Sequence, residues 1–271
     1  QQYGILRDEL SGISGLPCEA ETISSPGQIG EIFTSIVVKP RTISLHVAVL
    51  GHGRAELEER RRRLIRALNP INGLSTFIWN LEDGSRMLIR CRPDSGFPNF
   101  EEGTAPDAMI WDAYLDLIAD DPCYYAETEI VSPLRGFTGG WHLPLQFPMT
   151  FGGIGTVVSI QNPGDTPSPC TIELRGKLVE PVITNLTTGE SIAVRRTIEV
   201  GEVLKVTTAF GNKRVPLIDV FGTETNAMHY VTISSRFFQI PPGTVRLRYT
   251  ASEEGDTAIG YIRYVPRWLG Q

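Results

Sequence analysis

The sequence predicts a mainly β protein of two domains: a first domain with one α-helix, and a second that is a β-sandwich. The 271 residues include 27 glycines and 19 prolines, which favour turns and short strands over long helices. Clear helical periodicity occurs in a single stretch. Charge is uneven: residues 1–135 hold 13 basic and 20 acidic residues (net −7), and residues 136–271 hold 12 and 11 (net +1). We therefore expect domains at residues 1–130 and 151–271, joined by a connector at 131–150.

The first domain opens with residues 1–32, which are rich in glycine, serine and proline and predict a long loop or extended arm. Loops of this length tend to be functional, so we expect residues 11–30 to contact another subunit. Residues 31–53 alternate between apolar and polar, which predicts strand structure. Pro40 places a turn or bulge within them, because proline cannot donate to a strand ladder.

One α-helix is predicted over residues 54–70, where apolar residues form one stripe and Pro70 ends the helix. Four consecutive arginines, residues 60–63, resemble a nucleic-acid or membrane patch. Each of three glutamates, however, precedes an arginine by four residues, an orientation worth about 0.2–0.5 kcal/mol per pair. A self-neutralised helix face is therefore the favoured interpretation, and a charged intersubunit contact is the alternative. The three expected pairs are Glu56–Arg60, Glu58–Arg62 and Glu59–Arg63.

Strands are expected after the helix. Asp83-Gly84 lies between two apolar runs and predicts a hairpin over residues 75–93. Residues 108–131 alternate and predict a long strand, with a helix before Asp120 as the alternative. From about residue 156 onward, short strand candidates follow each other at close spacing, which indicates a sandwich or barrel.

The triplet Asn185-Leu186-Thr187 fits the pattern of an N-glycosylation acceptor. It lies in "PVITNLTTGESIAV", where a strand meets a turn and returns. Gly189 supplies the turn conformation that other residues resist. We interpret the triplet as part of a hairpin and the match to the acceptor pattern as chance.

No catalytic, metal or cofactor site is predicted. Gly51-x-Gly53 between a strand and a helix resembles a dinucleotide fingerprint, but Glu56 replaces the third glycine and would repel a pyrophosphate. The four histidines lack metal-ligand spacing, and there is no G-x-S-x-G nucleophile motif. Aspartates between residues 112 and 121 offer an acid/base pair, but an outward polar strand face is the favoured interpretation.

The composition excludes further functions. A net charge of −6 argues against general nucleic-acid binding. No apolar run approaches the roughly 18 residues of a membrane span, so we expect no membrane insertion. The four cysteines are far apart and are expected to be buried or half-buried thiols rather than a disulfide framework. The sequence therefore predicts a binding or structural protein and no enzyme.

An ordered series of segments in the second half resembles the distal tail protein family of long-tailed (siphovirus-type) phages. The segments are "WHLPLQFP", "IQNPGDTPSPCTIELRG", "PVITNLTTGESIAV", "GEVLKVTTAFGNKRV", "SSRFFQIPPGTVRLRYTA" and "IRYVPRWLG". The resemblance covers residues 130–271 and, with fewer matching features, residues 31–130. In the latter range it rests on the order of strand, helix, "LEDG" hairpin and "DPCYY".

The resemblance implies a structural adaptor in the virion, at the distal end of the tail, synthesised in the host cytoplasm. The first domain would be similar in fold to tail-tube proteins and form a six-membered ring, and the second would be a galectin-like β-sandwich. The implied partners are other copies of the chain, the tail tube protein, the central tail-tip protein and, in many phages, receptor-binding proteins. No cofactor is implied. An acidic first half is suited to lining a channel for DNA, because like charges repel phosphate.

Six charged residues are candidates for the ring interface. Three lie on the predicted helix (Glu59, Arg62 and Arg66), and three lie on predicted strands (Arg41, Arg86 and Arg90). The alternative function is a carbohydrate-binding host adhesin that uses the second domain, with Trp141 stacking on a sugar. We favour a different role for Trp141 and Phe147, which is to anchor the connector in an apolar pocket.

Overall fold

The computed structural model describes residues 3–5, 10–94, 99–102, 110–134, 156–254 and 258–270. The described chain is mostly β-strand, which confirms the predicted fold class. It divides into two compact units. The first comprises residues 1–127 together with 268–271, and the second comprises residues 128–267. Strand β10 (Ile130–Leu134) belongs to the second unit, and the remainder of the expected connector lies outside the described residues.

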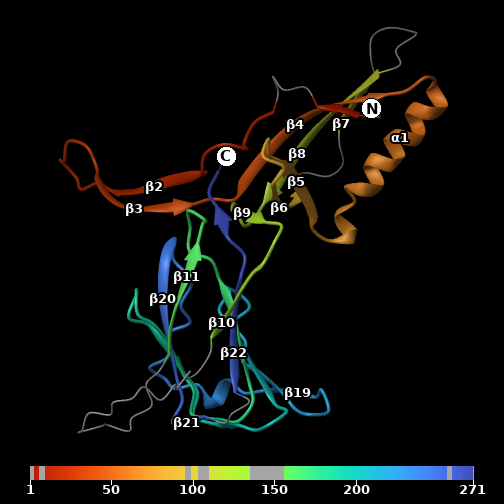
Figure 1. Cartoon of the computed structure of the whole chain (residues 1–271). Helices are drawn as coiled ribbons and strands as arrows, with labels where there is room; N and C mark the ends of the chain where they lie inside the picture. The colour runs from red at the N-terminus through yellow and green to blue at the C-terminus, as the bar shows by residue number, and fades with distance from the viewer. Residues whose placement is uncertain are drawn as a thin grey trace. The chain divides into compact units, whose positions relative to one another are not determined.

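The first unit is built on an antiparallel sheet whose strand order is β1-β4-β8-β6-β9-β23, with β5 paired to β6 and β7 paired to β8 (Figure 1). The bounds are β1 (Tyr3–Ile5), β4 (Arg41–Leu50), β5 (Ser75–Asn80), β6 (Arg86–Pro93), β7 (Asn99–Glu102), β8 (Ile110–Ala119), β9 (Tyr124–Ala126) and β23 (Arg267–Trp268).

Strands β4 and β8 confirm the predicted alternation. They pair from Arg41 opposite Ala119 to Leu50 opposite Ile110, so every second residue of each strand faces the same side. On one side, Leu45 and Leu115 lie opposite each other and are buried in the core. The burial of β8 alternates along its length, so the helix alternative for this segment is wrong. The strand hairpin expected around Asp83-Gly84 forms as β5 and β6.

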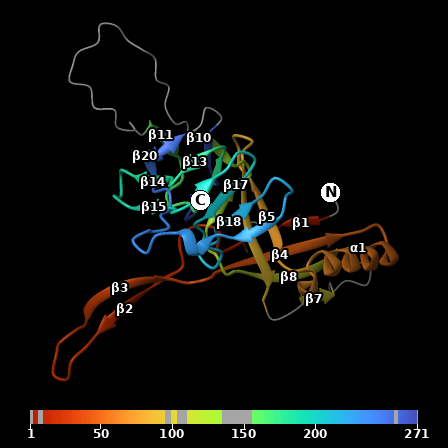
Figure 2. The same ribbon diagram turned by 90° about the horizontal axis from the view of Figure 1, so that it is seen from below.

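Helix α1 (Arg54–Ala67) lies alongside this sheet (Figures 1 and 2). Leu57 is buried in the core, and Leu64 and Leu68 pack against it, as the predicted apolar stripe requires. A Cβ added at Gly51 would lie 2.9 Å from Leu57 Cγ, so the close approach of strand and helix favours glycine there. A 3₁₀ turn, η2 (Pro70–Asn72), follows the helix.

The Gly/Ser/Pro-rich segment is more regular than expected. It contains β2 (Cys18–Ile23), which pairs with β3 (Ile32–Val38) in a two-stranded antiparallel sheet. We call residues 18–38 the arm. The arm extends away from the rest of the first unit in both views (Figures 1 and 2). An extended arm was one of the two predictions for this segment, but its strand character was not predicted.

The second unit is a β-sandwich. Its two main sheets have the strand orders β10-β22-β12-β17-β18-β19 and β11-β20-β14-β15, and a smaller sheet has the order β16-β13-β21. Both main sheets contribute to one core, for example Ile172 and Ile262 from the first and Ile183 and Leu247 from the second. The strands other than β10 are β11 (Thr156–Asn162), β12 (Cys170–Arg175), β13 (Leu178–Val179), β14 (Val182–Asn185), β15 (Ser191–Ala193), β16 (Thr197–Ile198), β17 (Val203–Thr207), β18 (Pro216–Ile218), β19 (Glu224–Asn226), β20 (Gly243–Thr250), β21 (Glu253–Glu254) and β22 (Ile259–Tyr264).

The expected hairpin around the acceptor-like triplet forms between β14 and β15. Asn185 is fully buried, and its Oδ1 accepts hydrogen bonds from the backbone N–H groups of Thr187 (3.0 Å) and Thr188 (3.3 Å). Gly189 has a φ of 78°, in the left-handed region that favours glycine. The asparagine therefore holds the turn from inside the domain, in line with the interpretation as a hairpin residue.

Candidate functional site

Large apolar side chains are exposed together on the arm. Ile23, Ile32, Phe33 and Ile36 are each about 60% exposed, and Val38 is 47% exposed. The arm's two strands pair with each other and with no other described strand. An isolated two-stranded sheet is marginally stable in water, and clustered exposed apolar residues mark interaction sites. The arm therefore has the properties of a segment that is completed by another surface.

Helix α1 carries both paired and unpaired charges. Arg63 Nη2 lies 3.0 Å from Glu59 Oε1, as predicted, and Arg60 pairs with Glu56. The prediction of a Glu58–Arg62 pair is wrong. Glu58 Oε1 instead lies 3.9 Å from Arg54 Nε. Within the described part of the chain, Arg62 and Arg66 are exposed and form no ion pair. These two arginines are therefore available to an acidic partner.

Glu56 explains why the glycine-rich turn before the helix is unsuited to phosphate. Its Oε2 accepts a hydrogen bond of 2.8 Å from the backbone N–H of His52. This bond is the main cause that holds the pKa of Glu56 below its ordinary value. The carboxylate thus occupies the N–H that a phosphate would need, which supports the rejection of the dinucleotide interpretation.

The hairpin of β5 and β6 presents two more candidate residues. Arg86 Nη1 lies 3.1 Å from Glu127 Oε1, and both side chains are about half exposed. Arg90 is exposed opposite Thr76 and has no ion pair within the described ranges. Ile78, 49% exposed, lies between them on the partner strand. This face combines a free positive charge with apolar area, which is common in protein interfaces.

The structure gives Arg41 a different role from the expected one. Its side chain is buried, and its guanidinium donates to four backbone carbonyls. These are Gly12 (2.8 Å), Ile13 (2.9 Å), Pro122 (2.9 Å) and Leu269. The guanidinium carbon also lies 5.0 Å from the centre of the Tyr124 ring. We therefore withdraw Arg41 from the interface candidates, because every part of its head group is engaged inside the first unit.

The face of β4 and β8 opposite the core is polar. Ser44 Oγ donates to Asp116 Oδ1 at 2.6 Å, and His46 Nε2 lies 3.0 Å from Asp112 Oδ1. The ring of Tyr114 stacks on His46 with centroids 4.3 Å apart. Asp112 and Asp116 thus form the outward polar strand face that the sequence favoured over an acid/base pair.

Three of the four cysteines are buried, as expected, but the expectation is wrong for Cys18, which is exposed on the arm. Burial raises the pKa of the Cys170 thiol to about 12, and it also raises the pKa of Cys91. Buried thiols with raised pKa values are unreactive, so they behave as small apolar core residues. Across the described ranges no group of three His, Cys, Asp or Glu is placed to hold a metal ion.

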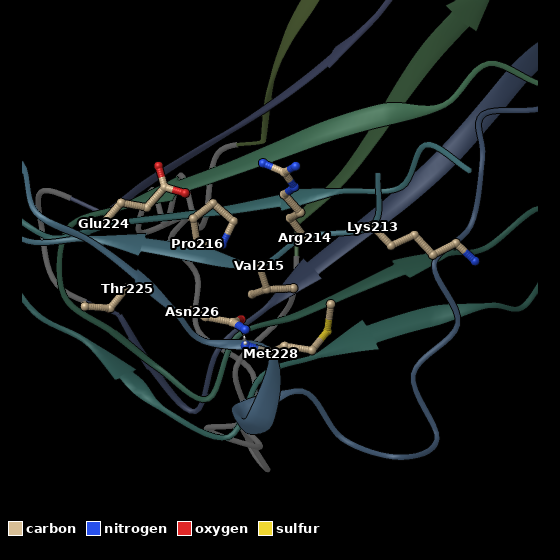
Figure 3. A pocket seen from close by; sticks show the side chains of 8 residues that line it. All are labelled: Lys213, Arg214, Val215, Pro216, Glu224, Thr225, Asn226 and Met228. Atoms are coloured by element: carbon tan, nitrogen blue, oxygen red, sulfur yellow. Dashed lines mark hydrogen bonds between the residues drawn. The ribbon is translucent and has the colours of Figure 1, made fainter. Parts of the chain in front are cut away.

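The second unit carries a shallow groove of about 430 Å³ beside β18 and β19 (Figure 3). Sequence reasoning missed it, because its residues share no spacing pattern and come together through the pairing of two short strands. The side chains along it include Lys213, Arg214, Pro216, Glu224, Asn226 and Met228. Trp141, on which the sugar-binding alternative depends, lies outside the described residues, as does Phe147. In the described chain, no helix is long and apolar enough to cross a membrane.

Two family models match the chain. The model of the phage tail protein RIFT-related domain matches residues 3–98. The model of the siphovirus-type tail component, C-terminal domain, matches residues 163–268. The first match lies in the first unit, and all of the second match except residue 268 lies in the second unit. No curated protein matches the sequence significantly.

Solved phage structures share the fold. One is the crystal structure of SPP1 Dit (gp 19.1), described as a paradigm of the hub adsorption apparatus in phages that infect Gram-positive bacteria. Its sequence is 16% identical to that of this chain, and the two structures align with a TM-score of 0.68. The alignment covers 97% of this chain and 93% of that one. A chain of the phage P2 baseplate in its activated conformation with Ca is 13% identical with a TM-score of 0.54, covering 98% and 91%. The ordered segments, the two family models and the shared fold agree, and the chain belongs to the distal tail proteins of siphovirus-type phages.

Proposed function

We propose that the protein is a structural adaptor that forms a ring at the phage tail tip and links the tail tube to the tail-tip and host-recognition proteins. The proposed partners are further copies of the chain, in a homo-hexameric ring, the tail tube protein, the central tail-tip protein and receptor-binding proteins. The role is structural, with no catalytic step and no sequence-specific contact to nucleic acid. The protein is a component of the virion tail, and we place it at the distal end.

The observation that carries the ring is the arm. Its apolar side chains are exposed, and its two strands lack a third strand or a covering element among the described residues. If the arm of one subunit covers a different surface of the next, the contact is heterologous, and such contacts close into a ring when the rotation closes. Each subunit then supplies one arm and receives one.

Charged residues would fix how the two subunits are aligned in this contact. Arg62 and Arg66 on α1 and Arg90 on β6 are exposed and form no ion pair within the described ranges. Glu59 and Arg86 form exposed ion pairs with Arg63 and Glu127, and each could exchange that partner for a residue of the neighbouring subunit. Exposed pairs contribute little affinity, but complementary charge selects the partner and its orientation. We therefore keep these five residues as interface candidates.

The acidic face of β4 and β8 is our candidate for the wall of the ring's channel. Asp112 and Asp116 are held there by His46 and Ser44, so their carboxylates are fixed rather than flexible. A wall of fixed negative charge repels the phosphates of passing DNA, which prevents adhesion.

The test replaces two exposed arm residues in the full-length chain, as Phe33→Asp with Ile36→Asp. Both side chains are 60% exposed, so the fold should survive while the buried contact between subunits is lost. Light scattering after gel filtration and electron microscopy are expected to show rings for the wild type and monomers for the double variant. The matched control is Ile71→Asp in η2, a residue that is 89% exposed outside the arm, and it should still form rings. Rings from the double variant, or a wild type that stays monomeric at high concentration, would contradict the proposal.

A further inference from the structure

Strand β19 is the last described strand of the six-stranded sheet in the second unit. Strand β19 pairs on one side with β18, with Leu217 opposite Thr225, and no described strand pairs with its other side. The flanking hydrogen bonds run from Ala227 N to Val215 O (2.8 Å) and from Asp219 N to Thr223 O (3.1 Å). Hydrogen-bonded pairs recur at every second residue of an antiparallel ladder.

This register determines which way the main chain of β19 points. Because residues 227, 225 and 223 bond toward β18, the N–H and C=O groups of Glu224 and Asn226 point away from it. Two residues spaced by two positions therefore offer two donors and two acceptors on the outer edge. An incoming extended chain uses this pattern when it adds a strand to a sheet.

The groove spans β18 and β19, so it adjoins this edge, and it is charged differently at its two ends (Figure 3). Lys213 and Arg214 lie at the end near Asn226 and Met228, whereas Glu224 lies at the other end. The Lys213 ammonium is held 5.1 Å from the centre of the Phe210 ring and 5.9 Å from that of Phe237. The groove is thus positive at one end and negative at the other.

The turn between β18 and β19 is held by hydrogen bonds to Asp219. The carboxylate of Asp219 accepts hydrogen bonds from the backbone N–H groups of Phe221 and Thr223, both at 2.8 Å. The turn leaves Phe221 90% exposed and Val220 62% exposed beside the negative end of the groove. An edge that is already formed binds a peptide at a lower cost in conformational entropy, and the exposed apolar side chains beside it offer contact area.

We propose that the outer edge of β19 binds an extended peptide segment of another protein by strand addition. In the antiparallel arrangement, the N-terminal end of the peptide lies at the end of β19 that is nearer Lys213 and Arg214, and it carries acidic residues. Its C-terminal end lies beside Glu224 and carries a basic residue. This binding goes beyond the proposed ring and needs only the sheet of the second unit, so either proposal can fail without the other.

The test uses the full-length protein and a synthetic probe, a fluorescein-labelled peptide of sequence Asp-Glu-Val-Thr-Val-Thr-Lys. Fluorescence anisotropy is expected to show saturable binding, and hydrogen exchange should slow at the amides of Glu224 and Asn226. The same peptide with both valines and both threonines replaced by proline has no central N–H to donate in either register and should not bind. Absence of saturable binding by the first peptide would overturn the proposal.

Two pairs of variants locate the contact. Glu224→Pro removes an outward N–H that the fold does not use and should weaken binding at least fivefold, whereas Glu224→Thr keeps the N–H and should weaken it less. Lys213→Glu should weaken binding of the acidic peptide, and Lys177→Glu, the same charge change at an exposed residue outside the groove, should leave it unchanged. Equal binding by Glu224→Pro and Glu224→Thr, or by Lys213→Glu and Lys177→Glu, would contradict strand addition at this edge.

Discussion

Arg41 connects three segments that are far apart in the sequence. Its guanidinium bonds the carbonyls of residues 12 and 13, Pro122 and Leu269, and it lies against the ring of Tyr124. A planar group with five donors suits several carbonyls at once, and burial makes each lost bond expensive. The residue thus acts as an internal cross-link of the first unit.

Replacing this arginine should destabilise the first unit. We expect Arg41→Met to lower the free energy of unfolding by about 3 kcal/mol, because it leaves several buried carbonyls without donors. Urea denaturation measures the change. Arg90→Met is the matched control at an exposed strand position and should change stability by no more than about 0.5 kcal/mol. Equal effects of the two variants would show that the buried hydrogen bonds contribute little.

Strand alternation places these two arginines on different kinds of face. Arg41 shares its face with the apolar residues Ile43, Leu45, Val47 and Val49, whereas Arg90 shares its face with Arg86 and Arg92. Alternation does not show that the segments around Gly12, Pro122 and Leu269 converge on Arg41 and supply its acceptors. Long-range convergence of this kind leaves no trace in periodicity, so the charged candidates were predicted as a set and only partly retained.

At the scale of elements, prediction worked where one face of an element is buried. β4, β8 and α1 each pack one side on a core, so their apolar residues recur with the period of the strand or helix. The arm was predicted less completely, because both of its faces are exposed and its tip contains serine, proline and glycine. The groove beside β19 had no sequence signal, since a three-residue strand is too short for periodicity.

The β14–β15 hairpin depends on its buried asparagine. We expect Asn185→Ala to lower the free energy of unfolding of the second unit by about 1–3 kcal/mol, because the N–H groups of Thr187 and Thr188 lose their acceptor. Thermal unfolding followed by circular dichroism measures this loss. Asn212→Ala, at an exposed turn residue, is the control and should be close to neutral. A hairpin that tolerates Asn185→Ala as well as it tolerates Asn212→Ala would show that the turn is specified by Gly189 alone.

At the scale of the whole molecule, the last residues of the chain belong to the first unit, which the sequence did not predict. Residues 268–271 belong with residues 1–127, although the whole second unit separates them along the chain. Trp268 packs against the first core, and the carbonyl of Leu269 accepts from Arg41. The expected boundaries assigned these last residues to the second domain, because a segment this short has no pattern of its own.

A shortened chain tests this arrangement. A chain ending at Arg267 should lose the contacts of Trp268 and Leu269, so limited proteolysis should cut within residues 1–127 faster, while residues 128–267 stay intact. A chain ending at Gly270 keeps both residues and is the control. Introducing Arg41→Met into the shortened chain should add less destabilisation than it does in the full chain, because the two changes remove one shared interaction. If the destabilisation by Arg41→Met were the same in the shortened and the full chain, the proposed interaction between Arg41 and Leu269 would be contradicted.

The return of residues 268–271 to the first unit also orders events during synthesis. The ribosome releases residues 1–127 first, but the carbonyl of Leu269 and the ring of Trp268 emerge only after all of residues 128–267. The unit that is made first is therefore finished last. Until Leu269 has been made and has left the ribosome, Arg41 lacks one of its four acceptors, so nascent chains that have not yet exposed Leu269 should carry an incomplete first core and a complete arm.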